Sequence, residues 1–246
     1  MTKTRTFTFF VSLGLTVVFA IGFIAFTTSQ TSKDDKILSY TVDVKSQDIK
    51  FYLRDDKGNF FSSILNLKTW LETKNEKLVF AMNGGMFKQD KFPQGLFIEE
   101  HKTITPLDTS SGKGNFYFKP NGVFYITTDK QAFICKTTDF IDNGKVKYAT
   151  QSGPMLVIDG EIHTALKEGS KNLNIRNGVG ILADNKVIFA MSKEQINFYD
   201  FANYFKKLGC KNALYFDGYV SRTYLPAKNW TQTDGDFGVI IGETTP

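Results

Sequence analysis

Two polar residues follow short apolar runs and precede a glycine, a pattern that places reactive groups at the ends of buried strands. Asn83 follows the run from Leu78 to Met82, and Asp217 follows the run from Ala213 to Phe216. The glycine after each lets the chain turn sharply and lets a ligand approach the backbone. Ligand sites often lie beyond the carboxyl ends of such strands. A carboxylate there suits nucleophilic or general-base catalysis, so Asp217 is the first candidate.

Asn-Gly and Asp-Gly pairs can also be simple tight turns. We assign that simpler meaning to Asp142-Asn143-Gly144 and Asp159-Gly160, which separate alternating segments as hairpin turns do. Asn83 and Asp217 differ from these because the strands before them are fully apolar and are themselves preceded by helical patterns.

Three further segments carry polar groups beside flexible backbone. They are Gln151-Ser152-Gly153-Pro154, Arg176-Asn177-Gly178 and Ser221-Arg222. The planar guanidinium of arginine suits phosphate binding, although Arg176 could equally be a surface charge. None of these segments is decisive alone.

The elements that must position these residues alternate between strands and helices. We predict strands at 39–44, 49–53, 78–82, 114–118, 123–127, 132–135, 155–158, 187–191 and 213–216, and helices at 62–74 and 196–208. Ser192 and Gln195 form a capping-box signature before the second helix, and Gly209 is placed to close it. The pattern predicts an α+β fold, a mixed sheet with meandering antiparallel strands and a few packed helices, in a single domain at 39–246.

The N-terminus predicts export. Lys3 and Arg5 precede an uncharged run from Phe7 to Phe26, which as a helix would be roughly 30 Å long, enough to cross a bilayer. We expect residues 1–29 to be an anchor or a signal segment and 30–38 a tether. The domain then lies outside the cytoplasm, periplasmic or extracellular, on a single-pass anchor, or is secreted if the segment is cleaved. A buried core helix is the remaining alternative for this run.

Charge and the remaining reactive residues narrow the choice of partner. The formal charge of +5 is evenly spread, which argues against nucleic acid as a partner.

Cys135 and Cys210 either form one disulfide or are two buried thiols. His101 and His163 lack the spacing of a zinc site, and we interpret both as surface or turn residues. We expect no certain cofactor, although Ca²⁺ could bind through oxygen ligands.

Taken together, the separated motifs resemble the phosphodiester glycosidase family. The resemblance runs from about Leu78 to Gly242 and is carried by four segments: Asn83-Gly84-Gly85-Met86-Phe87, Gln151-Ser152-Gly153-Pro154, Arg176-Asn177-Gly178-Val179-Gly180, and Asp217-Gly218-Tyr219-Val220-Ser221-Arg222. Tyr219 and Val220 stand where a lysosomal member of the family has glycines, so the substrate is the least transferable property.

The resemblance implies an exported hydrolase that cleaves a sugar-1-phosphodiester at the glycosidic C–O bond, in envelope glycans or their precursors. Asp217 would be the nucleophile or general base, Arg176 and Arg222 would hold the phosphate, and Asn83 and Ser152 would position sugar hydroxyls or water. The substrate-binding set is Gly84, Gly85, Ser152, Gly153, Asn177, Gly218, Ser221 and Arg222. Backbone amides around Gly84, Gly85 and Gly153 could form an anion-binding nest. Glu99 and Asp108 are reserve candidates for a second carboxylate.

Two functions of other classes stay open. The first is a non-catalytic glycan-binding module, in which Tyr219, Tyr224 and Trp230 would stack on sugars; the helical spacing of Trp70 favours the core. The second is a metal-dependent phosphodiesterase, which would need a cluster of metal ligands. A carboxylate and an arginine converging on one pocket would favour the glycosidase.

Overall fold

The computed structural model describes residues 36–217 and 219–246. The expected anchor at 1–29 lies outside the described residues, as does Gly218. Within the described ranges, no helix combines the length and the apolar character needed to cross a membrane. Strand β1 begins at Ile37, inside the segment expected to be a tether.

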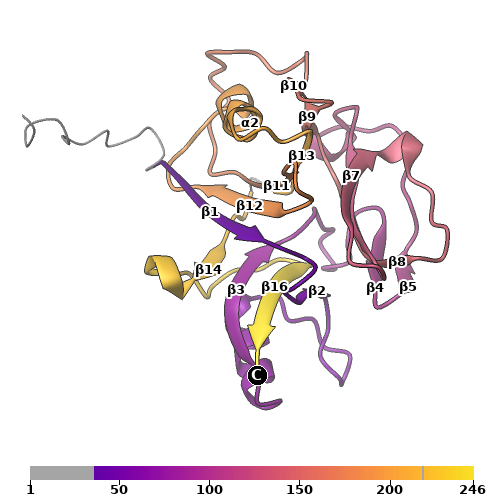
Figure 1. The fold of residues 1–246 in the computed structure, drawn as a ribbon, viewed down its shortest axis with the longest axis vertical. Helices are drawn as coiled ribbons and strands as arrows, with labels where there is room; N and C mark the ends of the chain where they lie inside the picture. Colours follow the sequence, from indigo (N-terminus) through magenta and orange to yellow (C-terminus); the bar gives the residue numbers. More distant parts are fainter. Residues whose placement is uncertain (1–35, 218) are drawn as a thin grey trace, which may run out of the picture. The chain divides into compact units, whose positions relative to one another are not determined.

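The strands form three sheets (Figure 1). The β11 sheet contains, in spatial order, β1 (Ile37–Val42), β12 (Val187–Ser192), β11 (Asn177–Ile181), β13 (Asn212–Tyr215), β9 (Met155–Ile158) and β10 (Glu161–Ile162). The β3 sheet contains β15 (Trp230–Thr231), β14 (Thr223–Leu225), β3 (Lys77–Asn83), β16 (Ile240–Thr245) and β2 (Ile49–Tyr52). The β8 sheet contains β5 (Lys102–Thr105), β4 (Phe97–Glu99), β8 (Val146–Ser152), β6 (Gly122–Thr127) and β7 (Ala132–Lys136).

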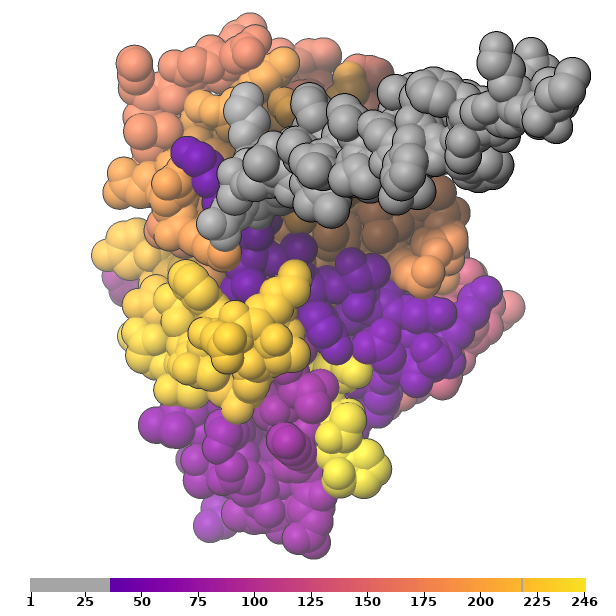
Figure 2. Space-filling model, turned by 60° about the vertical axis from the view of Figure 1, so that its left-hand side comes forward, coloured from indigo at the N-terminus to yellow at the C-terminus, as the bar shows by residue number. Residues whose placement is uncertain are grey.

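The expected α+β class is confirmed, but the expected mixed sheet is wrong. Every strand pair among the described residues is antiparallel. Strand β3, which follows a helix in the sequence, pairs with β14 and β16, which come from the far end of the sequence. Figure 2 shows the same relationship as indigo and yellow residues side by side on one face, and β16 pairs with β2 there.

In the part of the chain that the structure describes, two α-helices pack on the sheets. Helix α1 (Ile64–Glu72) begins at Ser63, whose side chain accepts a hydrogen bond from the backbone of Asn66. Helix α2 (Phe198–Lys207) has Asn197 as its N-cap, and the Asn197 side chain accepts a hydrogen bond from the backbone of Asp200. The predicted capping box at Ser192 and Gln195 is therefore wrong. Ser192 is the last residue of β12, and its sheet position takes precedence over its local capping preference. Gly209, with φ of +77°, follows the end of α2 as predicted.

Two local predictions in the middle of the chain are wrong. Residues 114–118 contain the 3-10 helix η2 (Asn115–Tyr117) instead of a strand, because Gly114 at φ +91° turns the chain. The Asp142–Gly144 turn follows the 3-10 helix η3 (Thr137–Asp139) and does not join paired strands, since β7 and β8 both pair with β6. Asp159-Gly160 does join the paired strands β9 and β10.

Phenylalanine side chains fill the space where the three sheets meet. The rings of Phe80 (β3) and Phe189 (β12) lie 5.2 Å apart, and Phe124 (β6) lies 5.9 Å from Phe189. Phe51 (β2) is 5.6 Å from Phe124. All four are nearly inaccessible to solvent, and burying each ring contributes roughly 1.5–3 kcal/mol. This aromatic core explains the large number of phenylalanines and fixes the sheets against one another.

The two cysteines are free thiols, so the disulfide alternative is wrong. Cys210 is buried beneath α2, where it belongs to the same apolar cluster as Phe205. Cys135 lies on β7 and is half-buried. Burial raises the pKa of Cys210 to about 12 and that of Cys135 to about 11, so both thiols stay protonated near neutral pH.

Candidate functional site

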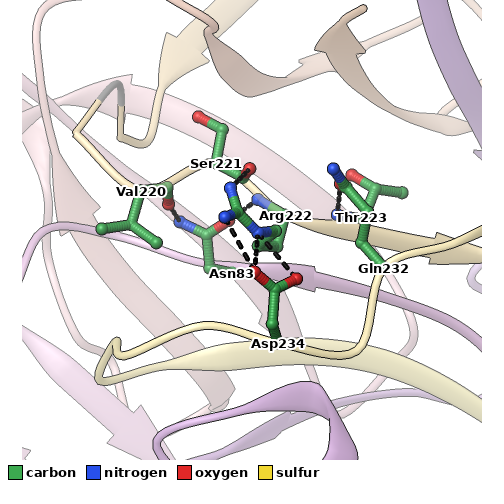
Figure 3. A network of polar contacts seen from close by, with 7 residues as sticks. All are labelled: Asn83, Val220, Ser221, Arg222, Thr223, Gln232 and Asp234. Atoms are coloured by element: carbon green, nitrogen blue, oxygen red, sulfur yellow. Dashed lines mark hydrogen bonds and ion pairs between the residues drawn. The ribbon is translucent and has the colours of Figure 1, made fainter.

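Asn83, the last residue of β3, uses its whole side chain to hold the loop that follows β13. Its Oδ1 accepts from the backbone N–H of Arg222 at 2.9 Å, and its Nδ2 donates to the carbonyl of Val220 at 2.6 Å. The side chain is 1% exposed. Figure 3 shows the amide of Asn83 lying against the 220–222 backbone. Asn83 therefore holds the loop instead of reaching the sugar hydroxyls or water that the sequence suggested.

Two further side chains hold the start of the same loop. Asn177, the first residue of β11, accepts from the backbone N–H of Asp217 at 2.9 Å. Ser152, the last residue of β8, donates its hydroxyl proton to the carbonyl of Phe216 at 2.8 Å. Each sheet thus supplies one polar side chain to the 216–222 backbone. Asn177 and Ser152, like Asn83, are positioning residues for Asp217.

This arrangement fixes Asp217 just beyond the carboxyl end of β13, an interior strand of the β11 sheet. Its Oδ1 accepts from the backbone N–H of Tyr219 at 2.8 Å, and its carbonyl accepts from the Ser221 hydroxyl at 2.8 Å. The residue is 6% exposed. Its carboxylate is held in one orientation by a backbone already bonded to three sheets.

Asp217 lines an open cavity of about 590 Å³. The other lining residues are Met86, Phe87, Lys88, Gln89, Lys91, Gln94, Tyr219, Val220 and Asp236. This volume is in the range of small-molecule sites. The cavity offers two carboxylates, two lysines and apolar surface to a ligand of sugar size.

A short hairpin at 86–94 forms one wall of this cavity. The backbone N–H of Lys88 donates to Phe92 at 2.9 Å, and that of Gln94 donates to Met86 at 2.8 Å. Between these two hydrogen bonds, Phe87 and Pro93 face each other in an isolated antiparallel β-bridge. The wall is ordered backbone that presents the side chains around its turn to the cavity.

Arg176 does not reach the cavity as an anion clamp. Its guanidinium donates to the carbonyls of Ile196 and Asn172 at 2.9 Å each and to the Tyr215 hydroxyl at 3.3 Å. It stacks 3.6 Å above the Phe198 ring and is 0% exposed. Burial lowers its pKa. The expected phosphate contact does not fit, because this side chain presents no surface to a ligand.

Arg222 is held outside the lining of the cavity. Its Nε donates to both carboxylate oxygens of Asp234 at 2.8 and 2.9 Å, and its Nη2 lies 2.8 Å from Asp234 Oδ2 (Figure 3). Hydrogen bonding from Arg222 holds the pKa of Asp234 below its usual range. Arg222 therefore enters the site through its backbone, which Asn83 holds.

The glycines of the motifs allow close backbone packing. The N–H of Gly84 donates to Val239 at 2.8 Å, so it is not available to an anion-binding nest. A Cβ at Gly85 or at Gly153 would lie 2.6 Å from the nearest neighbouring atom. Gly218, expected to bind substrate, lies outside the described residues.

The two reserve carboxylates lie outside the cavity lining, whereas several residues that the sequence analysis did not single out lie in it. Neither Glu99 nor Asp108 lines the cavity with Asp217, and Asp108 instead accepts from Ser110 and Tyr117. The charged cavity residues missed from the sequence are Lys88, Lys91 and Asp236. The two lysines flank a polar turn directly after the Met86-Phe87 motif, which was the available signal.

Metal and aromatic candidates also have defined places. Across 36–217 and 219–246, no group of three or more His, Cys, Asp or Glu side chains is placed to hold a metal. His101 is an exposed turn residue. His163 is not at the surface: it is buried at the start of a turn, where it accepts from the N–H groups of Ala165 and Leu166. Trp70 packs against core aromatics as expected. Tyr219 is 96% exposed and lines the cavity.

Comparison with known proteins gives the same family as the motifs. The phosphodiester glycosidase family model matches residues 76–239, a range that includes Asn83, Ser152, Asn177 and Asp217. An uncharacterized protein, YigE of Escherichia coli K12, is 34% identical over 190 residues, which cover 77% of this chain and 74% of that protein.

Two solved structures share the fold. The zebrafish N-acetylglucosamine-1-phosphodiester α-N-acetylglucosaminidase catalytic domain, auto-inhibited by its pro-peptide, has a TM-score of 0.55 at 15% identity, covering 86% of this chain and 89% of that one. A candidate exported protein from Burkholderia pseudomallei has a TM-score of 0.54 at 9% identity, covering 84% and 73%. The family model, spanning the loop that three sheets hold, confirms the resemblance, and the chain belongs to the phosphodiester glycosidase family.

Proposed function

We propose that this chain is an exported hydrolase that cleaves a sugar-1-phosphodiester at the glycosidic C–O bond, in envelope glycans or their precursors. The observation that carries the proposal is the position of Asp217: its carboxylate lines a cavity of about 590 Å³ while one side chain from each sheet holds its loop. Family membership supports hydrolysis of a phosphodiester glycoside.

The proposed reaction adds water across the bond between the anomeric carbon and the bridging oxygen. That oxygen leaves with the phosphate, which departs as a phosphate monoester, and the sugar gains the hydroxyl of water. As general base, Asp217 removes one proton from the attacking water, whose other proton stays in the new sugar hydroxyl, and releases the removed proton to solvent. As nucleophile, Asp217 first forms a glycosyl ester that water then hydrolyses. The anomeric configuration of the product separates the two routes, since a single displacement inverts it.

The substrate proposal is limited to the bond type. The zebrafish relative is named for an N-acetylglucosamine 1-phosphodiester. In this chain Tyr219 and Val220 line the cavity beside Asp217, and they make its wall bulkier than a glycine loop would. We therefore take the scissile linkage, and not the sugar, as the shared property.

Location and metal use are parts of the proposal that rest on composition. The run from Phe7 to Phe26 supports membrane attachment or a cleaved signal, and fractionation of cells expressing the full chain distinguishes them. Calcium bound through oxygen ligands is tested by turnover after removal of metal with a chelator and after re-addition of Ca²⁺.

The deciding experiment incubates the protein with a panel of sugar 1-phosphodiesters in ¹⁸O-labelled water. Label on the sugar supports C–O cleavage, whereas label on phosphate supports the metal-dependent phosphodiesterase. Asp217→Asn, which keeps the acceptor for Tyr219 N–H, should lose turnover while remaining folded. Asp142→Asn, in an exposed turn away from the cavity, is the matched control. Saturable binding of the sugars without turnover would instead identify a glycan-binding module.

A further inference from the structure

We infer that Lys88 binds the phosphate of the substrate and that the 86–94 hairpin is the leaving-group side of the cavity. This inference rests on the proposed function, which it deepens by naming the residue that recognises the charged group. It begins from the two arginines that sequence favoured. Arg176 is fully buried among its acceptors, and Arg222 is paired with Asp234. A phosphate in the cavity must therefore find its counter-charge elsewhere.

The cavity lining carries two lysines and two carboxylates, and Lys91 pairs with Asp236. Lys91 Nζ lies 2.5 Å from Asp236 Oδ1 and also donates to the carbonyl of Asp236 at 3.4 Å. Lys88 is exposed, and among the residues that the structure describes no ion pair includes it. What remains is a lysine with no ion pair among the described residues, in the same cavity lining as Asp217. This arrangement fits a ligand with a single negative charge beside a sugar.

The hairpin that presents Lys88 is held firmly from outside the cavity. The Arg54 guanidinium lies 4.7 Å from the Phe92 ring and 4.3 Å from the Phe60 ring, and the two rings are 5.2 Å apart in an edge-to-face contact. On its other side, Gly238 allows the carbonyl of Lys91 to approach, since a Cβ there would lie 2.6 Å from that oxygen. The backbone position of the lysine turn is therefore fixed, while the Lys88 side chain is free to reach a ligand.

The chemistry of the leaving group makes such a lysine more than a binding contact. A phosphodiester carries one negative charge, and its C–O cleavage releases a phosphate monoester whose charge approaches two. The added charge develops on the phosphate as the bond breaks, so an ammonium group beside it stabilises the transition state more than the bound substrate. Lys88 should thus affect kcat as well as KM, and only for a phosphate leaving group.

The first test measures binding of inorganic phosphate to the purified wild-type chain and to Lys88→Gln, Lys88→Arg and Lys167→Gln. Lys167 is an exposed lysine that does not line the cavity. We expect Lys88→Gln to weaken binding by about 10-fold, the loss of one charge-assisted contact of about 1.4 kcal/mol. The other two variants should bind like wild type. Equal binding by Lys88→Gln, or no binding by wild type at millimolar phosphate, overturns the inference.

The second test compares turnover of a sugar 1-phosphodiester with turnover of an aryl glycoside of the same sugar. Lys88→Gln should lower kcat/KM about 10- to 100-fold for the phosphodiester and leave the aryl glycoside unchanged. An unaffected phosphodiester rate in Lys88→Gln removes the inference but leaves the proposed function intact. Phosphate binding that depends on Lys88, in a wild-type chain that hydrolyses no phosphodiester, removes the proposed function and leaves the anion site.

Discussion

Asn177 on β11 donates its side-chain amide to both the backbone oxygen and the side-chain oxygen of Asn83 on β3, at 2.9 Å each. Both residues are almost completely buried. In such surroundings hydrogen bonds are strong and an unpaired polar atom is costly. The amide pair therefore joins two sheets at the point where each contacts the loop carrying Asp217.

Replacing Asn83 should damage both stability and activity. Asn83→Ala leaves the Arg222 N–H and the Val220 carbonyl without their partner and removes one of the two bonds from the Asn177 amide, which keeps the backbone oxygen of residue 83. We expect the free energy of unfolding to fall by about 3 kcal/mol, at about 1–3 kcal/mol for each buried unsatisfied group, with loss of turnover. Urea denaturation followed by circular dichroism measures the first effect.

Asn203→Ala is the matched control for this change. Asn203 is a half-buried asparagine on α2 that does not line the cavity. It should unfold within about 0.5 kcal/mol of wild type. If Asn83→Ala unfolded at the same urea concentration as this control, the bonds to the loop would contribute nothing to stability.

Arg176 should act as a structural residue. Arg176→Lys keeps the charge but loses the planar fork that reaches Ile196 and Asn172 and the stacking on Phe198. We expect a loss of about 2 kcal/mol in the free energy of unfolding, measured by thermal and urea denaturation. A raised KM for the phosphodiester with unchanged stability would restore Arg176 as the phosphate ligand.

Glu99 should lower stability in its ionised form. Burial raises the pKa of this carboxyl, which means that the folded state disfavours the charge relative to the unfolded state. The folded state is therefore most stable below the pKa that Glu99 has in the unfolded chain. Stability is lost as the pH rises through the higher pKa that Glu99 has in the folded chain. Glu99→Gln should melt at a higher temperature than wild type at pH 7 and at nearly the same temperature at pH 3. The backbone N–H of Leu53 and the charge of Arg54 act in the opposite direction, because both lower the pKa of Glu99. A higher melting temperature for wild type than for Glu99→Gln at pH 7 would show that these two interactions outweigh the burial.

The two cysteines should behave as protected thiols. With the pKa of Cys135 raised to about 11 and that of Cys210 to about 12 by burial, neither forms much thiolate at pH 8. A thiol reagent should react slowly with the native chain and rapidly with two thiols per chain in denaturant without reductant. Zero thiols under the second condition would indicate a disulfide.

The sequence predicted where the motif residues lie better than what they do. Asn83 and Asp217 were placed at strand ends correctly, because the apolar runs before them could only be buried strands. The role of Asn83 could not be predicted, since its partner Arg222 is 139 residues away in the chain. Antiparallel pairing of β3 with β16 was missed for the same reason. Long-range pairing is not encoded in local periodicity.

Neighbouring residues in one motif also took different roles. Arg176 stacks on Phe198 of α2, whereas Asn177 bonds to Asn83 of β3. Successive side chains of extended backbone point to opposite faces, so one motif supplied a structural contact on one side and a loop contact on the other. Lys88 was overlooked because a polar turn after a motif resembles ordinary solvated surface.

Because three sheets bond to one loop, that loop reaches its final structure only late in the synthesis of the chain. Strand β16 is C-terminal to every other described strand, and it lies between β2 and β3, the strand that ends in Asn83. A nascent chain that lacks β16 has an incomplete β3 sheet, so the bonds from Asn83 to the loop are not yet anchored. If Asp217 carries the proposed hydrolysis, activity would begin only once β16 has been synthesised and paired, with no separate inhibitor required.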